Sequence, residues 1–450
     1  MSMPADALPP PLPLMRRLDG IHGPTLRAGL IGLIWVLLWI PLGMLDGLRA
    51  ERHEHAEAAA RTIAEGWGGP QRLSGVHLRR QTPIGSRTLL PEVQRVSVRL
   101  RTERRQIGIH AQPVYLADVR FEGHFRAADL AQLLDVGRDF QDEAAAAIAE
   151  TGRGDAVIQL GVLDPVGLRH LGRLTLGDQR VELLPTSAAL QLTTLGAPIE
   201  FNESADLPFA LDLTLAGIEA LDLLPFARDY QLSVQGDWPH PGFGGRLLPV
   251  EREVGEAGFT ARWQVSEFNR AYPQLFDDQV NPIDETVRQS AVGVSLKEPG
   301  GAYQQHARAL KYAAMFIALA LCGFWLVELW LGLPLHPLHY GLAGLTQVMF
   351  YLLLLALAEH LGFGLAWLLA AAAVVLLTGS WCIAILKARR RGVLAGALLA
   401  AIYGLLYGLV VAEEHSLLMG SLLLFAMLAL LMWLTRQLGG GSTPIPEMRA

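Results

Sequence analysis

The sequence predicts a membrane protein, with an α-helical transmembrane bundle of six spans and a β-rich, mixed α+β domain outside the membrane. Hydrophobic residues make up 51% of the chain and the mean hydropathy is +0.31, which is high for a wholly soluble protein. Charge is concentrated between the apolar segments. The chain has 43 acidic and 37 basic residues. Two acidic and three basic residues precede residue 46, and five acidic and seven basic residues follow residue 308. Residues 46–308 therefore contain 36 acidic and 27 basic residues, a net charge of −9.

Six apolar stretches are long enough to cross a bilayer. A spanning helix needs roughly 20 mainly apolar residues, because the hydrocarbon layer is about 30 Å thick and each helical residue rises 1.5 Å. The predicted spans are residues 28–45, 312–333, 338–358, 361–386, 393–412 and 416–434. The first has the basic lead of a signal peptide, but its apolar run is too long and Leu48 does not suit cleavage after Ala50, so a retained anchor is predicted.

Loop charges predict the orientation of the spans, since short cytoplasmic loops carry the excess of Lys and Arg. Basic residues at 387–391 place the loop between the fourth and fifth spans in the cytoplasm, and Arg436 does the same for the end of the sixth. Both termini are therefore expected inside and residues 46–308 outside. The predicted regions are a disordered tail (1–27), an anchor (28–45), an outer domain (46–308), five spans (309–436) and a tail (437–450).

The outer region changes from a helical to a strand pattern. A helix is expected to continue outward through ERHEHAEAAARTIAEGW, and alternation in RVSVRL then predicts a half-buried strand. Similar short runs occur at VYLADVRF, AVIQLGVL, RVELL, FALDLTL, YQLSV and FTARWQV. They favour an antiparallel, sandwich-like domain, interrupted by a helix somewhere in residues 127–150.

No motif supports catalysis, a cofactor or a resident metal. HEHAE at 53–57 has Glu57 at the position where a zinc protease needs its second histidine, and neither a nucleophile elbow nor a phosphate loop is present. The acidic outer region also argues against nucleic acid as a partner, because phosphates require clustered Lys and Arg. The sequence therefore predicts a protein that is not an enzyme.

Ionisable residues near the spans are candidate functional residues, because burying charge in lipid is costly. Glu328 lies within an apolar run, and the structural alternative is that it reaches the interface or pairs with His336 or His339. The predicted outer turns place acids beside histidines. These further candidates are Glu359, His360, Glu413, Glu414 and His415.

Several segments resemble the CreD family of inner-membrane proteins of Gram-negative bacteria. They include GIHAQPVYLADVRFEGHF (108–125), DWPHPGFGGRLLP (237–249), GFTARWQVSEFNR (258–270) and VGVSLKEPGGAYQQHARALKYA (292–313), followed by LHPLHYGLAGLTQVMFYLLLLALAEHLGF (335–363) and EEHSLLMGSLLLFAMLALLMWLTR (413–436). The resemblance covers most of the chain after about residue 66, and LDPVGL at 163–168 departs from the family pattern. Trp238 and His240 of the second segment are further candidates, with a core tryptophan as the alternative.

The resemblance implies an inner-membrane location, a periplasmic outer domain and a link to envelope integrity and envelope-stress sensing, without an enzymatic activity or cofactor. The leading hypothesis is a non-catalytic protein that binds or scaffolds envelope proteins or peptidoglycan, with the lipid bilayer as its other partner. A transporter or channel formed by the C-terminal spans is the alternative. A membrane enzyme using His360 and His415 is a third hypothesis, and the oligomeric state is left open.

Overall fold

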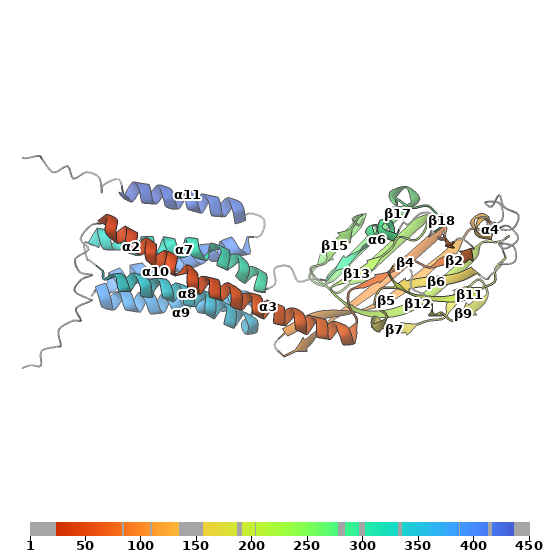
Figure 1. Ribbon diagram of the computed structural model, residues 1–450, viewed down its shortest axis with the longest axis horizontal. Coiled ribbons are helices and arrows are strands. Elements are labelled where there is room, and N and C mark those ends of the chain that lie inside the picture. The colour runs from red at the N-terminus through yellow and green to blue at the C-terminus, as the bar shows by residue number, and fades with distance from the viewer. Residues whose placement is uncertain are drawn as a thin grey trace, which may run out of the picture. The chain divides into compact units, whose positions relative to one another are not determined.

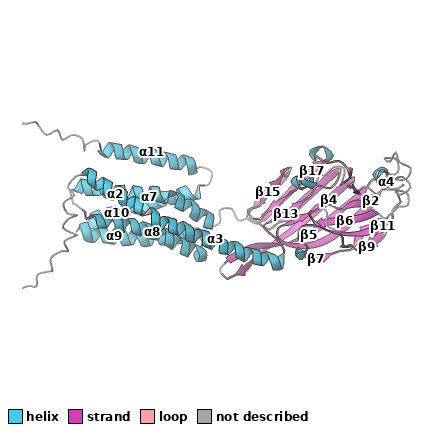
Figure 2. Cartoon of the chain, viewed as in Figure 1, coloured by secondary structure: helices cyan, strands magenta, loops and turns pink. Residues whose placement is uncertain are grey.

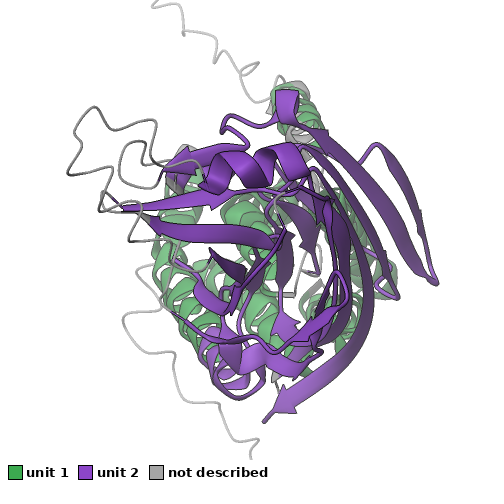
Figure 3. Ribbon diagram, turned by 90° about the vertical axis from the view of Figure 1, so that its right-hand side faces the viewer, with its two compact units in different colours: residues 1–55, 300–450 green, residues 56–299 purple. Residues whose placement is uncertain are grey.

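The computed structural model divides the chain into two compact units. The helical unit comprises residues 1–55 and 300–450, and the strand-rich unit comprises residues 56–299 (Figure 3). Figure 2 shows long helices in the first and strands in the second. The structure describes residues 24–82, 85–108, 110–134, 156–186, 191–202, 204–277, 284–296, 302–331, 335–386, 388–412 and 416–435.

The helical unit consists of long helices (Figure 1). They are α2 (Pro24–Leu37), α3 (Trp39–Trp67), of which residues 56–67 belong to the strand-rich unit, α7 (Ala302–Leu331), α8 (Pro337–Leu361), α9 (Phe363–Leu386), α10 (Arg389–Val411) and α11 (Ser416–Thr435). Among the described residues, five helical stretches are long and apolar enough to span a membrane, with α2 and α3 counted together. The sixth predicted span lies on α11, a helix of 20 residues, and the count of six stays a prediction.

Close helix packing in this unit depends on a glycine of α10. A Cβ placed on Gly392 would lie 2.6 Å from the backbone nitrogen of Ile383 in α9, which is inside van der Waals contact. Small residues let membrane helices approach until their backbones touch. The first glycine of the G-x-x-x-G pair at 392 and 396 therefore packs α10 against α9 within the bundle.

The strand-rich unit contains two sheets. Within the described residues, the ten-stranded sheet is made of β1 (Gln71–Leu73), β2 (His77–Thr82), β3 (Gly85–Leu89), β6 (Ala156–Val162), β10 (Leu184–Pro185), β11 (Thr193–Ile199), β13 (Ala220–Leu223), β15 (Gly242–Gly245), β18 (Leu275–Asp277) and β19 (Val292–Ser295). The nine-stranded sheet, counted over the same residues, is made of β4 (Val93–Ile107), β5 (His110–Phe125), β7 (Leu168–Leu171), β8 (Leu174–Leu176), β9 (Gln179–Val181), β12 (Leu207–Ile218), β14 (Asp229–Gly236), β16 (Glu251–Gly255) and β17 (Gly258–Ser266).

One apolar core joins the two sheets. It contains Leu73 and Ile158 from the ten-stranded sheet together with Val96, Phe121 and Leu232 from the nine-stranded sheet, all at most 2% exposed. Because strand side chains alternate between faces, the same strands direct polar residues away from this core. The result is a sandwich whose nine-stranded sheet has a polar outer face.

The predicted strand runs lie in strands, with RVELL divided between β9 and β10. Most pairings are antiparallel, as expected, but β1 pairs with β13 and β4 pairs with β14 in parallel. These partners are far apart in sequence, so no hairpin turn sets their relative direction. The expected antiparallel architecture therefore does not extend to these two pairs.

Short helices complete the strand-rich unit. The predicted helix in 127–150 begins as α4 (Ala127–Leu134), and its remainder lies outside the described residues, as do residues 151–155. The other short helices are α6 (Asp284–Gln289), η2 (Pro165–Gly167) and η3 (Glu267–Asn269). Val287 of α6 packs into a second apolar cluster with Phe226 and Tyr272, so α6 adds a small core beside the main one.

Candidate functional site

Glu328 of α7 lies inside the helical unit and is 4% exposed. Its carboxylate forms an ion pair with Arg27 of α2 and accepts a hydrogen bond from the hydroxyl of Tyr340 of α8. The proposed pairing of Glu328 with His336 or His339 is wrong, because its ion-pair partner is Arg27, which lies 301 residues away in sequence. Glu328 therefore holds three helices together.

Glu359, near the other end of α8, belongs to a second cluster of the same kind. Its Oε1 accepts a hydrogen bond from the hydroxyl of Tyr303 at 3.2 Å, and its Oε2 lies 3.8 Å from a guanidinium nitrogen of Arg52. His360 is exposed beside it. Glu413, Glu414 and His415 lie outside the described residues, so whether they approach Glu359 stays a prediction.

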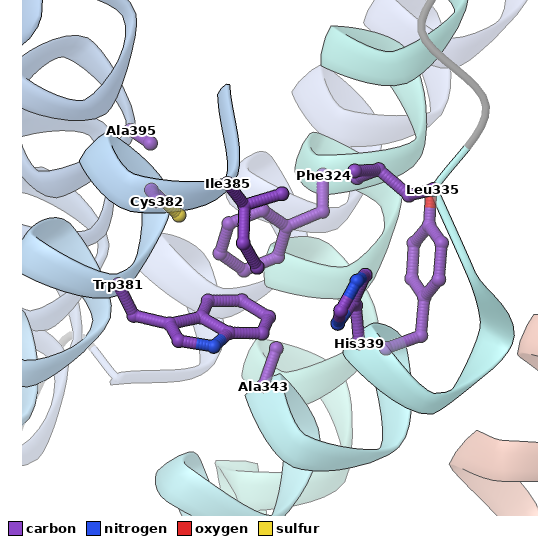
Figure 4. Close-up of a pocket in the computed structure, with 9 residues that line it drawn as sticks. Phe324, Leu335, His339, Ala343, Trp381, Cys382, Ile385 and Ala395 are labelled. Atoms are coloured by element: carbon purple, nitrogen blue, oxygen red, sulfur yellow. The ribbon is translucent and has the colours of Figure 1, made fainter. Parts of the chain in front are cut away.

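His339 lines a small cavity among α7, α8, α9 and α10 (Figure 4). Its ring lies edge-on to that of Trp381 with the centroids 5.3 Å apart. The cavity has a volume of about 20 Å³, which is room for about one water molecule. Its walls are apolar apart from a few side chains, so His339 and Trp381 pack the interior of the helical unit.

Trp238 is a core residue of the strand-rich unit. It is 7% exposed, and its indole Nε1 donates a hydrogen bond to the carbonyl oxygen of His240 at 3.0 Å. Asp237 accepts hydrogen bonds from the backbone nitrogen and the hydroxyl of Thr102 at 2.9 and 2.8 Å. Trp238 is therefore a core tryptophan, which was the alternative to a functional role. His240 is an exposed side chain close to Asp237, which Thr102 holds in place.

The outer face of the nine-stranded sheet is a polar surface. Its central part has three rows of exposed or half-buried side chains that run across β17, β14, β4, β5 and β12. The rows are Gln264, Gln231, Arg95, Glu122 and Ala210; Arg262, Ser233, Ser97, Arg120 and Asp212; and Thr260, Gln235, Arg99, Asp118 and Thr214. We call these three rows the polar face.

Two adjoining hollows lie over the polar face. Their volumes are about 540 and 380 Å³, and both are bordered by Ser97, Arg120 and Ser233. The first extends toward β16 and β17, and the second extends toward His170 of β7. Ligand pockets commonly have volumes of about 300 to 1,000 Å³, so each hollow is large enough for a small ligand or part of a polymer.

Ion pairs organise the charges on the polar face. Arg120 contacts Glu122 at 2.5 Å and Asp212 at 3.7 Å, and Arg262 contacts Glu251 at 3.1 Å. The hydrogen bond to Glu122, followed by the charge of Asp212, raises the pKa of Arg120. Arg120 therefore remains a cation at the border of both hollows.

The residues of the polar face were missed among the sequence candidates, although the pattern that places them was visible. In RVSVRL the buried residues Val96, Val98 and Leu100 alternate with exposed Arg95, Ser97 and Arg99. Alternation identifies which side chains point outward from a strand, but not which strands lie beside it. The other residues of the three rows come from strands up to about 170 residues away in sequence, because β14 pairs with β4 on one side and with β17 on the other.

The fold defines a multi-pass membrane protein with a strand-rich domain between its first helices and its remaining helices. The family model described as "Inner membrane protein CreD" matches residues 24–439. The Inner membrane protein CreD of Escherichia coli (strain K12) is 30% identical over 439 residues, which cover 92% of this chain and 93% of that protein. The chain therefore belongs to the CreD family of inner-membrane proteins.

Proposed function

We propose that this protein contributes to envelope integrity and the envelope-stress response by non-catalytic binding. The polar face of the strand-rich unit would be the binding surface, and an envelope protein or peptidoglycan would be its partner. The observation that carries the proposal is the pair of adjoining hollows over this face, which are lined by charged and amide side chains. A binding role requires such a shaped, polar surface and needs no catalytic group.

The proposal includes a periplasmic position for the strand-rich unit and cytoplasmic positions for both termini. Membership of an inner-membrane family supports a location at this membrane, and the basic residues Arg389, Arg390 and Arg391 at the start of α10 support a cytoplasmic loop there. With one crossing before residue 56 and an odd number after residue 300, the strand-rich unit would face the periplasm. The binding surface would then meet envelope polymers and periplasmic proteins.

Photo-crosslinking in intact cells tests this function. A photoreactive amino acid would replace Ser97, which borders both hollows. In a control variant the same photoreactive amino acid would replace Glu256, an exposed turn residue outside the hollows. We expect Ser97 to capture a defined envelope protein or peptidoglycan fragment that Glu256 does not. Equal capture at the two positions, or capture of lipid alone, would contradict a binding role for the polar face.

A further inference from the structure

Two arginines of β4 stand on the polar face without an ion-pair partner among the described residues. Arg95 and Arg99 are exposed, and Ser97 lies between them on the same face of the strand. Four residues of extended strand place their Cα atoms about 13 Å apart. The polar face therefore carries two uncompensated cations at a defined spacing.

The acids that face these arginines are already bound by other groups. Glu122 lies opposite Arg95 in the sheet, but it pairs with Arg120. Asp118 lies opposite Arg99 in the same way. The sheet register would allow Arg95 to pair with Glu122 and Arg99 to pair with Asp118. Neighbouring donors that compete for these two acids therefore decide whether the pairs form.

The competing donors of Asp118 are identified by geometry. Arg101 contacts its Oδ2 at 2.9 Å, and the hydroxyl of Thr214 donates a hydrogen bond to its Oδ1 at 2.9 Å. Both oxygens of Asp118 are thus bound without Arg99. The guanidinium groups of Arg95 and Arg99 therefore border the hollows without an ion-pair partner among the described residues. A guanidinium can bind a carboxylate of a ligand with two parallel hydrogen bonds.

The neighbours of the two arginines suit a peptide better than a bare sugar. On β14, Gln231 and Gln235 lie beside Arg95 and Arg99 and present amide donors and acceptors. The described aromatic residue that borders the first hollow is Trp263, which is 2% exposed and lies in the core, so it offers no platform for stacking a sugar ring. Asp212, at the edge of the second hollow, already lies 3.7 Å from Arg120, so the two arginines are the charged groups that this face leaves for a ligand.

We propose that the polar face binds the short peptide arms of peptidoglycan, with Arg95 and Arg99 each binding a free carboxylate. This proposal rests on the proposed function and names its ligand. An extended peptide advances about 3.3 to 3.6 Å per residue, so four residues span the distance between the two arginines. A peptide arm of this length carries free carboxylates, and these complement Arg95 at the first hollow and Arg99 at the second.

The test uses the full-length protein in lipid nanodiscs and a soluble disaccharide-tetrapeptide from peptidoglycan as the probe. Affinity would be measured by isothermal titration calorimetry for the unchanged protein, for the R95Q/R99Q variant and for R246Q. Arg246 is an exposed arginine after β15, outside both hollows, and is the matched control. A second probe has its peptide carboxylates converted to amides.

We expect R95Q/R99Q to lower the affinity by roughly tenfold or more, because two charge-assisted contacts are lost, and R246Q to leave it unchanged. R95K/R99K should retain part of the affinity, and the amidated probe should bind the unchanged protein as weakly as the first probe binds R95Q/R99Q. Equal affinity for both probes, or for R95Q/R99Q and R246Q, would overturn the proposal. Circular dichroism of each variant checks that the strand-rich unit remains folded.

The ligand assignment and the proposed function fail separately. If the unchanged protein does not bind the disaccharide-tetrapeptide while a photoreactive residue at position 97 captures an envelope protein, the ligand assignment is wrong and the binding function stands. If the polar face neither binds the probe nor captures a defined partner, both proposals fail.

Discussion

Two clusters of an arginine, a glutamate and a tyrosine connect the first helices of the helical unit to α7 and α8. In the first cluster, Glu328 of α7 pairs with Arg27 of α2 and accepts a hydrogen bond from Tyr340 of α8. The side chain of Glu328 is 5% exposed and that of Arg27 is 28% exposed. The first cluster is therefore a largely buried ion pair with an added neutral donor.

The second cluster has the same composition with the helices exchanged. Here Glu359 comes from α8 and Tyr303 from α7, while Arg52 comes from α3. The glutamate is 11% exposed, but Arg52 is 47% exposed and lies 3.8 Å away. Solvent can reach this arginine, so the charge of Glu359 depends much less on its protein partner.

Because the two clusters share their composition and differ in burial and geometry, we expect the first to stabilise the protein more than the second. In low-dielectric surroundings a carboxylate that loses its cation has no water to replace it, whereas an exposed pair is screened. The rise of an α-helix places Tyr340 and Glu359 about 28 Å apart along α8, close to the thickness of the hydrocarbon layer. The two clusters therefore hold opposite ends of the same helix assembly.

The largest expected effect is at Glu328. Glu328→Gln removes the carboxylate that forms an ion pair with Arg27 inside the helical unit, and we expect a loss of about 3 to 5 kcal/mol in the free energy of unfolding. Denaturant unfolding in detergent measures it. The double variant R27Q/E328Q should lose less than E328Q alone, since both charges of the ion pair are then removed together. A loss below about 1 kcal/mol for E328Q would show that the first cluster is no stronger than the second.

Tyr340 tests the neutral member of the first cluster. Tyr340→Phe removes the hydroxyl that donates to Glu328 and leaves one carboxylate oxygen without this donor, so we expect a loss of about 1 to 3 kcal/mol. The same unfolding measurement applies, with Tyr407→Phe, an exposed tyrosine of α10, as the control. If Y340F loses no more stability than Y407F, the hydrogen bond from Tyr340 to Glu328 does not stabilise the protein.

Glu359 tests the second cluster directly. Glu359→Gln should cost at most about 1 kcal/mol, because the partly exposed Arg52 is screened by solvent and the ion pair is long. Raising the salt concentration should reduce the difference from the unchanged protein. A loss as large as that of E328Q would contradict the argument from burial.

The smallest effect is expected at Tyr303. Tyr303→Phe removes a 3.2 Å hydrogen bond to Glu359 at a partly buried position, and we expect about 0.5 to 1 kcal/mol. Measuring Y303F and E359Q singly and together gives their coupling energy. A coupling energy near zero would show that the hydrogen bond contributes no stability, and one above about 1 kcal/mol would make the second cluster comparable to the first.

Local patterns predicted much of the fold and little of the candidate site. Apolar length located the helices and alternation located the longer strands, as with Val96, Val98 and Leu100 in β4. The sequence also selected Glu328 as unusual, but assigned it the wrong partners. Short strands such as β1 and β19, with three and four residues, carry too little pattern to be recognised without their neighbours.

By itself, the sequence determined which segments are apolar enough for lipid, which strand residues face a core, and the resemblance to the CreD family. These properties depend on neighbouring residues and on the period of the backbone. Tertiary structure decided that Arg27 meets Glu328 and that Arg120 takes Glu122, leaving Arg95 without an ion pair among the described residues. Such choices depend on competition between groups far apart in the chain, and only the folded arrangement brings those competitors together.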